Sequence, residues 1–302
     1  MTEGHLFVVL SLLSHRGLCI NWISSGAVER TIAKIRKTLS YLKERGPLWT
    51  SLYVSHYLGV RALEEVERRI FALERRRFFT GENALTSQSN TISENNQKWS
   101  EYDWSAGGNE WTEAVRTLKG MDPAQWKGEL VDGLLCKHIK KGATVLEIGP
   151  GAGRWTEILQ PICGRLLLAD ISERCLQLCR ERFGQCANVE YHLIKGGRLD
   201  FLAAEMLDNI WSYDVFVHIN PTDTDRYLED LAPALKRGAV GIIHHAGSYA
   251  SEEERSGAFR SHLDGPFFAH LVQKHGMELL EQNATLTHKV GDLISVIRRP
   301  LA

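Results

Sequence analysis

The sequence predicts an α/β protein built on a doubly wound, mostly parallel sheet, with a helical extension at its N-terminus. Two observations favour this class. From about residue 141 onward, short apolar runs alternate with amphipathic helical segments, which is typical of parallel strands covered by helices on both faces. A glycine-rich turn also follows the first of these runs and precedes a helical segment, as in folds that bind a nucleotide at a strand-to-helix turn.

The strands and helices of this part follow from the hydrophobic pattern. Short runs of apolar and β-branched residues predict strands, and apolar residues three and four apart predict helices. The expected strands have the sequences ATVLEIG, GRLLLAD, NVEYHLI, YDVFVHI, AVGIIHH and DLISVIR. Helices are expected at about 153–160, 172–183, 222–235 and 265–275.

The N-terminal part differs from this pattern. Residues 28–44 carry a single apolar stripe, Gly46-Pro47 is expected to end that helix, and two more helices are expected at about 48–58 and 61–77. Short amphipathic helices cannot bury their stripes alone, so we expect this region to dock or to form a homo-oligomer. The predicted organisation is a helical region at 1–79, a polar linker at 80–97 and an α/β domain at 98–302.

Charge is divided unevenly along the chain. The 302 residues include 36 Lys and Arg and 37 Asp and Glu. Residues 1–79 hold 13 and 7 of these (net +6), which leaves 23 and 30 (net −7) for the rest. A basic helix face is usually solvated, although anionic lipid, nucleic acid or an acidic carrier could also bind there. No helix-turn-helix or zinc-finger pattern accompanies it, so a nucleic-acid partner is not expected.

Composition and cysteine spacing also bear on location. The chain is 43% hydrophobic and 24% charged, as in globular proteins, and its longest early apolar run, residues 6–13, is far shorter than a membrane span. No basic segment precedes that run, so no secretory signal is expected. The six cysteines form no CxxC pair, which favours reduced thiols and a cytoplasmic location.

The glycine-rich turn gives the most specific signal. Residues 145–156 read VLEIGPGAGRWT. A dinucleotide fingerprint, G-x-G-x-x-G, would require glycine at position 154, which is Arg154. The next strand ends in Asp170, 21 residues after Gly149, where a carboxylate can accept both hydroxyls of a ribose. A turn that only packs a helix on a strand, or one that binds NAD or FAD, is the alternative.

The pattern E-x-G-x-G-x-G followed by this aspartate resembles class I S-adenosylmethionine-dependent methyltransferases. The segment YDWSAGGNEWT and the pattern VFVHI…IIHH resemble those members that act on glycans and natural products. The resemblance covers about 141–299 and implies a Rossmann-like sheet of seven strands and S-adenosyl-L-methionine as cofactor. The third strand lacks the acidic residue that the family uses for adenine. The residues that the resemblance assigns to the cofactor are Glu147, Gly149, Pro150, Gly151, Gly153, Asp170 and Ile171.

Histidines gather where the acceptor is expected. Ligands of open parallel sheets bind at the carboxyl ends of the strands, and the fourth and fifth expected strands end near His218 and at His244-His245. A neutral imidazole can accept a hydroxyl proton near neutral pH. Because side chains alternate along a strand, only one of the adjacent histidines is expected to face the acceptor.

Other residues are candidates for metal or acceptor contacts. His218, Asp223 and Asp225, with a fifth-strand histidine, could bind Mg²⁺ or a similar divalent cation, although both aspartates could instead serve as charges at a helix start. Asn220-Pro221 matches only weakly the N-P-P-aromatic motif of enzymes that methylate base amines. Residues that could contact the acceptor are Tyr102, Trp104, Trp111, Arg260 and His262.

The sequence thus predicts an S-adenosylmethionine-dependent O-methyltransferase that acts on a sugar, a glycan or a small natural product, with a histidine as general base. An N-methyltransferase acting on protein or nucleic acid is the first alternative. The second is a methyltransferase-like module that only binds a partner, but retention of Glu147, the glycine turn and Asp170 disfavours it.

Overall fold

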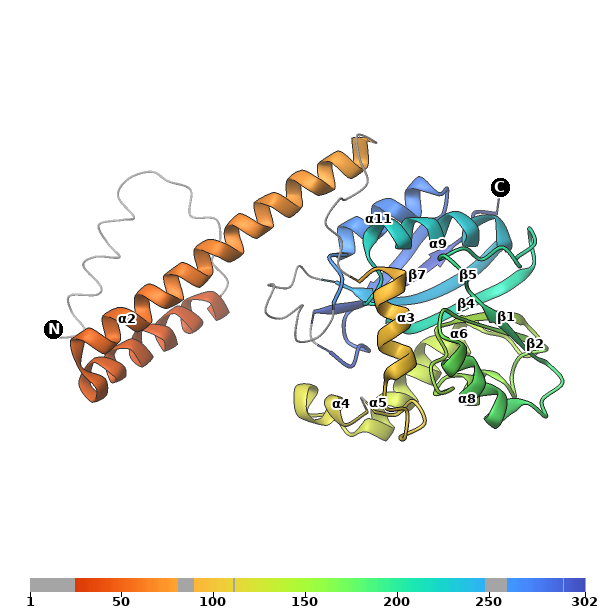
Figure 1. Cartoon of the computed structure of the whole chain (residues 1–302), viewed down its shortest axis with the longest axis horizontal. Helices are drawn as coiled ribbons and strands as arrows, with labels where there is room; N and C mark the ends of the chain where they lie inside the picture. Colours follow the sequence, from red (N-terminus) through yellow and green to blue (C-terminus); the bar gives the residue numbers. More distant parts are fainter. Residues whose placement is uncertain (1–24, 81–89, 111, 248–259, 290, 302) are drawn as a thin grey trace. The chain divides into compact units, whose positions relative to one another are not determined.

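The computed structural model describes residues 25–80, 90–110, 112–247, 260–289 and 291–301. The chain divides into two compact units, residues 1–69 and 70–302, and each is considered by itself (Figure 1). The predicted Trp111 contact lies outside the described residues, as do residues 1–24 and half of the expected linker, residues 81–89.

Most of the first unit is the helix α2, Ser25–Thr80, which continues into the second unit. Its helical conformation breaks at Gly46 (φ 82°, ψ 170°), directly before Pro47, so the predicted break there is confirmed. The two helices expected after the break form one continuous helix. The ring centroid of Tyr41 lies 5.0 Å from that of Trp49 and 4.9 Å from that of Tyr53. These rings therefore pack the helical segment before Gly46 against the one after it.

Several large apolar side chains of α2 are exposed, among them those of Leu48, Leu52 and Leu63. Exposed apolar stripes on a helix are often covered by another chain. The expectation that this region forms a homo-oligomer stays a prediction. Within the described residues, no helix combines the length and hydrophobicity needed to cross a bilayer.

A seven-stranded sheet forms the centre of the second unit, in the order β3-β2-β1-β4-β5-β7-β6. Strands β1 to β5 are parallel to one another, and β7 runs antiparallel to both β5 and β6. The predicted fold class is confirmed. The strands are β1 Thr144–Ile148, β2 Arg165–Asp170, β3 Val189–Leu193, β4 Leu207–Phe216, β5 Leu235–Ala246, β6 Glu278–Asn283 and β7 Asp292–Arg298.

Helices cover both faces of this sheet (Figure 1). One core layer includes Leu231 of α9 (Pro221–Ala234) and Phe268 of α11 (Gly265–Lys274). The opposite layer includes Trp126 of α5 (Pro123–Leu130) and Leu176 of α8 (Glu173–Phe183). The remaining helical segments of this unit are α4 Thr112–Lys119, the π-helical turn Val131–Leu135, α6 Cys136–His138 and α7 Thr156–Leu159.

The expected linker at 80–97 needs a correction, because the helix α3, Ile92–Glu101, begins inside it. The Thr91 side chain accepts a hydrogen bond from the Glu94 backbone N–H, and the Glu94 carboxylate accepts one from the Thr91 backbone N–H. This capping box fixes the helix start despite a polar composition. The helix docks at the end of β4 through Asn95, whose Nδ2 donates to the His218 carbonyl oxygen (2.9 Å).

We predict that Asn95→Ala lowers the free energy of unfolding by about 1–3 kcal/mol, because it leaves the buried His218 carbonyl without this donor. Asn95 is buried, and its Oδ1 also accepts from the indole N–H of Trp99. Asn96→Ala, at an exposed position of the same helix, should change stability little and controls for helix propensity. Urea unfolding of both variants provides the measurement, and equal losses would contradict the predicted anchoring role.

Candidate functional site

The glycine turn after β1 is shaped by close contacts. Gly149, Gly151 and Gly153 all have positive φ values, of 69°, 57° and 89°, which other residues adopt with strain. A Cβ atom at Gly149 would lie 2.4 Å from Val215 Cγ2, and one at Gly151 would lie 2.8 Å from the Trp104 ring. The turn therefore requires glycine for two reasons, its backbone conformation and the space available.

Glu147 supports this turn from within the core. Its side chain is 1% exposed, and Oε2 accepts a hydrogen bond from the Thr156 hydroxyl at 2.7 Å. Burial raises the pKa of Glu147 to about 8, although the bond from Thr156 lowers it. Glu147 does not line the pocket described below, so it acts on the turn and not directly on a ligand.

Asp170 lies at the end of β2 and lines the pocket. Its Oδ1 accepts a hydrogen bond from the Ser172 backbone N–H at 2.8 Å. Burial raises the pKa of this carboxyl to about 6, while bonds from backbone N–H groups lower it. A buried carboxylate facing a pocket is suited to accept hydrogen bonds from the hydroxyls of a ribose.

The pocket encloses about 840 Å³ of empty space, part of it open to solvent. Its walls come from the glycine turn, the ends of β2 and β4, and α3 with the segment after it. Apolar and aromatic side chains dominate the lining, and they include Ile92, Trp99, Trp104, Ile171, Ile194, Ile219 and Tyr227. The apolar walls and the carboxylate suit S-adenosylmethionine, which joins an adenosine to an amino acid.

The structure divides the seven expected cofactor residues into two groups. Gly149, Pro150, Gly151, Asp170 and Ile171 line the pocket. Glu147 and Gly153 do not, and a Cβ atom at Gly153 would lie 2.5 Å from the Phe183 ring. Gly153 therefore allows α8 to pack against the turn, which corrects the expectation that it faces the ligand.

The adjacent histidines of β5 point to opposite faces of the sheet, as the alternation predicts. The His245 ring stacks on Phe268, and its Nε2 is 2.7 Å from the Ser295 hydroxyl. His244 stacks on Tyr213, which lines the pocket (centroids 4.3 Å apart). His245 therefore lies in the core layer of α11, and this placement argues against it as the base.

His218 lies just after β4, two residues beyond its end, and not within a strand as expected. Its ring is 4.9 Å from that of Trp99, a side chain of the pocket wall. The Nη1 of Arg260 is 3.4 Å from its Nε2. His218 therefore belongs to the polar groups directly behind the wall of the pocket.

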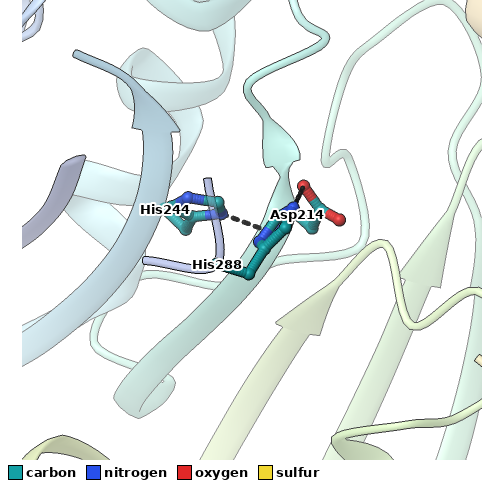
Figure 2. Close-up of side chains that lie close together, drawn as sticks. All are labelled: Asp214, His244 and His288. Atoms are coloured by element: carbon teal, nitrogen blue, oxygen red, sulfur yellow. Dashed lines mark hydrogen bonds and ion pairs between the residues drawn. The ribbon is translucent and has the colours of Figure 1, made fainter. Parts of the chain in front are cut away.

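Asp214 is a pocket residue that the sequence did not identify. It lies in β4 with a positive φ of 64°, at an irregularity in the pairing of β4 with β5. Figure 2 shows its side chain beside those of His244 and His288. The Asp214 backbone N–H donates to His244 Nδ1 (3.0 Å), and its Oδ1 is 3.6 Å from His288 Nε2. Burial lowers the pKa of His288 to about 4, although Asp214 raises it.

Arg260 connects this group to a second carboxylate. Its Nη1 is 3.3 Å from Asp214 Oδ1, and its Nη2 is 2.9 Å from Asp292 Oδ2. Burial raises the pKa of the Asp214 carboxyl, but His288, Arg260 and His244 together hold it well below its usual range. The carboxylate is therefore ionised at neutral pH. Arg260, expected to contact the acceptor, instead stabilises two buried carboxylates.

The expected metal site is not assembled. Asp223 Oδ2 accepts from the Asn220 amide at 2.7 Å, and Asp225 is paired with Lys274 and His275. Both aspartates therefore contact residues of α9 or of the end of α11, and no described contact joins either of them to His218. Within the described residues, the ligand atoms of Asp214, His244 and His288 do come within 4.8 Å of one another. The guanidinium of Arg260 is paired with Asp214 in this group and already supplies the positive charge that a metal ion would bring.

Of the other residues expected to contact the acceptor, only some line the pocket. Trp104 lines the pocket, and the Tyr102 ring packs against it (centroids 5.1 Å apart) without being part of the lining. His262 is half-buried before α11 and does not line the pocket. Arg154 does line it, and sequence reasoning noted this residue only as a departure from the dinucleotide fingerprint.

Comparisons with known proteins agree with this geometry. Residues 145–238 match the family described as methyltransferase domain. An rRNA adenine N-6-methyltransferase of Streptomyces fradiae is 46% identical over 63 residues, which are 21% of this chain and 19% of that protein. The chain thus matches about a fifth of the length of this curated relative.

A solved structure of low sequence identity shares the fold. A complex of DhpI with S-adenosylhomocysteine is 15% identical, with a TM-score of 0.51 over 70% of this chain and 97% of that one. An S-adenosylmethionine-dependent methyltransferase from Mesorhizobium loti is 13% identical, with a TM-score of 0.49 over 58% and 100% of the two chains. Residues 145–238 therefore match a methyltransferase domain, and the sheet order and the glycine turn around them are those of the class I S-adenosylmethionine-dependent methyltransferase fold.

We predict that Glu147→Gln makes the protein more stable than the wild type at high pH. A carboxyl whose pKa is raised on folding stabilises the fold below its unfolded pKa, and this stabilisation is lost as the pH rises toward the folded value, here about 8. The difference in unfolding free energy should shift toward the variant between pH 5 and pH 8.5 by on the order of 4 kcal/mol. Glu181→Gln, at an exposed position, is the control, and a pH-independent difference for Glu147→Gln would contradict the prediction.

Proposed function

We propose that this protein transfers the methyl group of S-adenosylmethionine to a hydroxyl of a sugar, a glycan or a small natural product. When bound, the cofactor supplies an electrophilic methyl group. The protein must then orient the acceptor oxygen and accept its proton, because an ordinary hydroxyl is a weak nucleophile.

The observation that supports this proposal is the polar network behind the pocket wall at the ends of β4 and β5. It contains His218, His244 and His288, held by Asp214, Asp292 and Arg260. Imidazoles and carboxylates in one buried group can take up and delocalise a proton. A hydroxyl acceptor needs such a group more than a nitrogen acceptor does, because the nitrogen carries a free lone pair.

Within this network we assign the proton acceptor to His218, which would receive the proton through a water molecule because its ring lies behind the pocket wall, and a positioning role to His244. The His218 ring contacts Trp99 at the pocket wall. Both nitrogens of His244 face protein groups instead, since Nδ1 accepts from the Asp214 N–H and Nε2 lies 3.5 Å from Asp292 Oδ2. These contacts suit His244 to hold the backbone of Asp214 in place.

The curated relative acts on adenine in rRNA by its name, which supports N-methylation as a second candidate. The contacts of Asn220 argue against it. Its Oδ1 accepts from the Asp223 backbone N–H, and its Nδ2 donates to Asp223 and to the Asn90 carbonyl. An amide used in this way caps α9 and is not available to hold an exocyclic amine.

We predict that His218→Gln lowers kcat for a hydroxyl acceptor by about 10²–10⁴-fold while the affinity for S-adenosylhomocysteine changes less than about twofold. His270→Gln, at an exposed position of α11, is the matched control. Acceptors would be found by mass spectrometry of a panel of sugars, phenols and RNA. Methylation of adenine alone would overturn the O-methyltransferase proposal, and full activity of His218→Gln would remove this residue as the base.

A further inference from the structure

Exposed apolar side chains of α2 lie on one side of the helix. After the break at Gly46 the helix is continuous, and successive residues of an α-helix are turned by about 100°. Leu48, Leu52, Leu63 and Val66 therefore project within about 60° of one another, and each is more than half exposed. Together they form the 48–66 stripe, which is about 27 Å long at a rise of about 1.5 Å per residue.

The 48–66 stripe is not the face that joins the two segments of α2. Tyr53, whose ring packs on Tyr41 of the first segment (centroids 4.9 Å apart), projects about 110° away from the middle of the stripe. The first segment therefore leaves the stripe uncovered. A continuous exposed apolar surface of this kind marks a site of interaction with another molecule.

Gly59 lies in the middle of the stripe, on the same face of the helix. Glycine inside a helix is unfavourable relative to alanine. The described part of the chain gives no local reason for it, because its φ is not positive and a Cβ atom there would meet nothing within 4 Å. Small residues let two helix backbones approach closely, so the position of Gly59 suits a crossing with a second helix.

The stripe is arranged symmetrically about Gly59. Leu52 and Val66 lie seven residues before and after it, and Ser55 and Leu63 lie four residues before and after it. In two antiparallel helices that cross at Gly59, positions equally far from the crossing lie at the same height. A two-fold contact between copies of one chain must be complementary to itself, and this spacing meets that condition.

Charge favours the antiparallel direction. Residues 46–60 contain no Asp, Glu, Lys or Arg, whereas residues 61–69 contain six. In an antiparallel pair that crosses at Gly59, the charged part of each helix lies beside the uncharged part of the other. A parallel pair would instead place like charges of 61–69 at the same height. Glu65 and Arg69 form an ion pair of 3.0 Å within their own helix, at the side of the stripe, where they can stay hydrated.

A membrane surface is the other occupant that an apolar helix face beside basic residues could have. Helices that lie on anionic lipid carry mainly Lys and Arg on their polar face. Three of the six charged residues in 61–69 are glutamates, which disfavours an anionic bilayer along this half of the stripe.

We propose that a second copy of the chain covers the 48–66 stripe, with the two α2 helices antiparallel and crossing at Gly59. The contact is isologous, because the same face of each copy forms both halves of it. This inference concerns the helical extension alone and depends neither on the cofactor nor on the acceptor.

The test is the mass of the full chain, measured by size-exclusion chromatography with light scattering over a range of concentrations. The wild type should be a dimer of twice 34.1 kDa. Leu52→Glu and Leu63→Glu should each raise the dissociation constant about tenfold or more, because they place a charge in an apolar contact. Leu58→Glu is the matched control, because Leu58 is also exposed but projects about 100° away from Gly59.

Gly59→Leu separates the contact between copies from the stability of the helix. The change improves helix propensity and keeps the stripe apolar, and its Cβ meets no described atom of its own chain. It fills the space at the crossing, so the dissociation constant should rise about tenfold or more. The helix content by circular dichroism should stay equal or increase, and circular dichroism also verifies that the other variants fold.

Cysteine cross-linking tests the direction of the pair. Ser55 and Ala62 lie four residues before Gly59 and three after it, on one side of the stripe. An antiparallel pair therefore brings Ser55 of one copy near Ala62 of the other. An equilibrated mixture of Ser55→Cys and Ala62→Cys should form an oxidised dimer, whereas neither variant alone should exceed the wild-type background from the chain's own cysteines.

A monomeric wild type would overturn the inference, and so would equal weakening of the dimer by Leu58→Glu and Leu52→Glu. Cross-linking of Ser55→Cys alone would contradict the antiparallel direction. Sedimentation of a monomeric wild type with vesicles of phosphatidylserine would assign the stripe to a membrane surface instead.

Discussion

The ion pairs of Arg260 with Asp214 and Asp292 are the interaction on which the carboxyl edge of the sheet depends. Two carboxylates buried at the ends of β4 and β7 would repel each other and lose their hydration without a cation between them. The guanidinium of Arg260 offsets this repulsion and loss of hydration, and it also fixes the side chain of Asp214. The strained backbone of Asp214 is held separately, by its N–H bond to His244. The pocket wall therefore owes its shape to a network that mostly lies behind it.

A second set of buried hydrogen bonds connects α3 to the residues that follow β4. Asn95 of α3 binds the His218 carbonyl, and Asn220 binds the Asn90 carbonyl just before α3. These bonds fasten a polar helix over the pocket, where its residues Ile92 and Trp99 become part of the lining. A helix with little apolar surface can dock in this way only because buried hydrogen bonds replace hydrophobic burial.

The sequence predicted the parts of the fold that repeat a simple period. The buried strands β1 and β2, the glycine turn and Asp170 follow from apolar runs and glycine spacing. Strand β6 was missed because its sequence, ELLEQN, lies at the sheet edge, where two of its six positions are exposed and none is fully buried. The start of α3 was missed because a polar composition outweighed the Thr91-x-x-Glu94 capping signal. Asp214 and His288 depend on a pairing irregularity and on a turn before β7, and neither leaves a periodic signal.

The charged groups of the pocket differ in how they are held. Asp170, at the end of β2, accepts hydrogen bonds from backbone N–H groups, including that of Ser172. Asp214, in β4, is fixed by side chains instead, because its Oδ1 contacts both Arg260 and His288, and neither of these residues lines the pocket. A substitution behind the pocket wall can therefore move the Asp214 carboxylate, whereas the position of Asp170 depends on the local backbone.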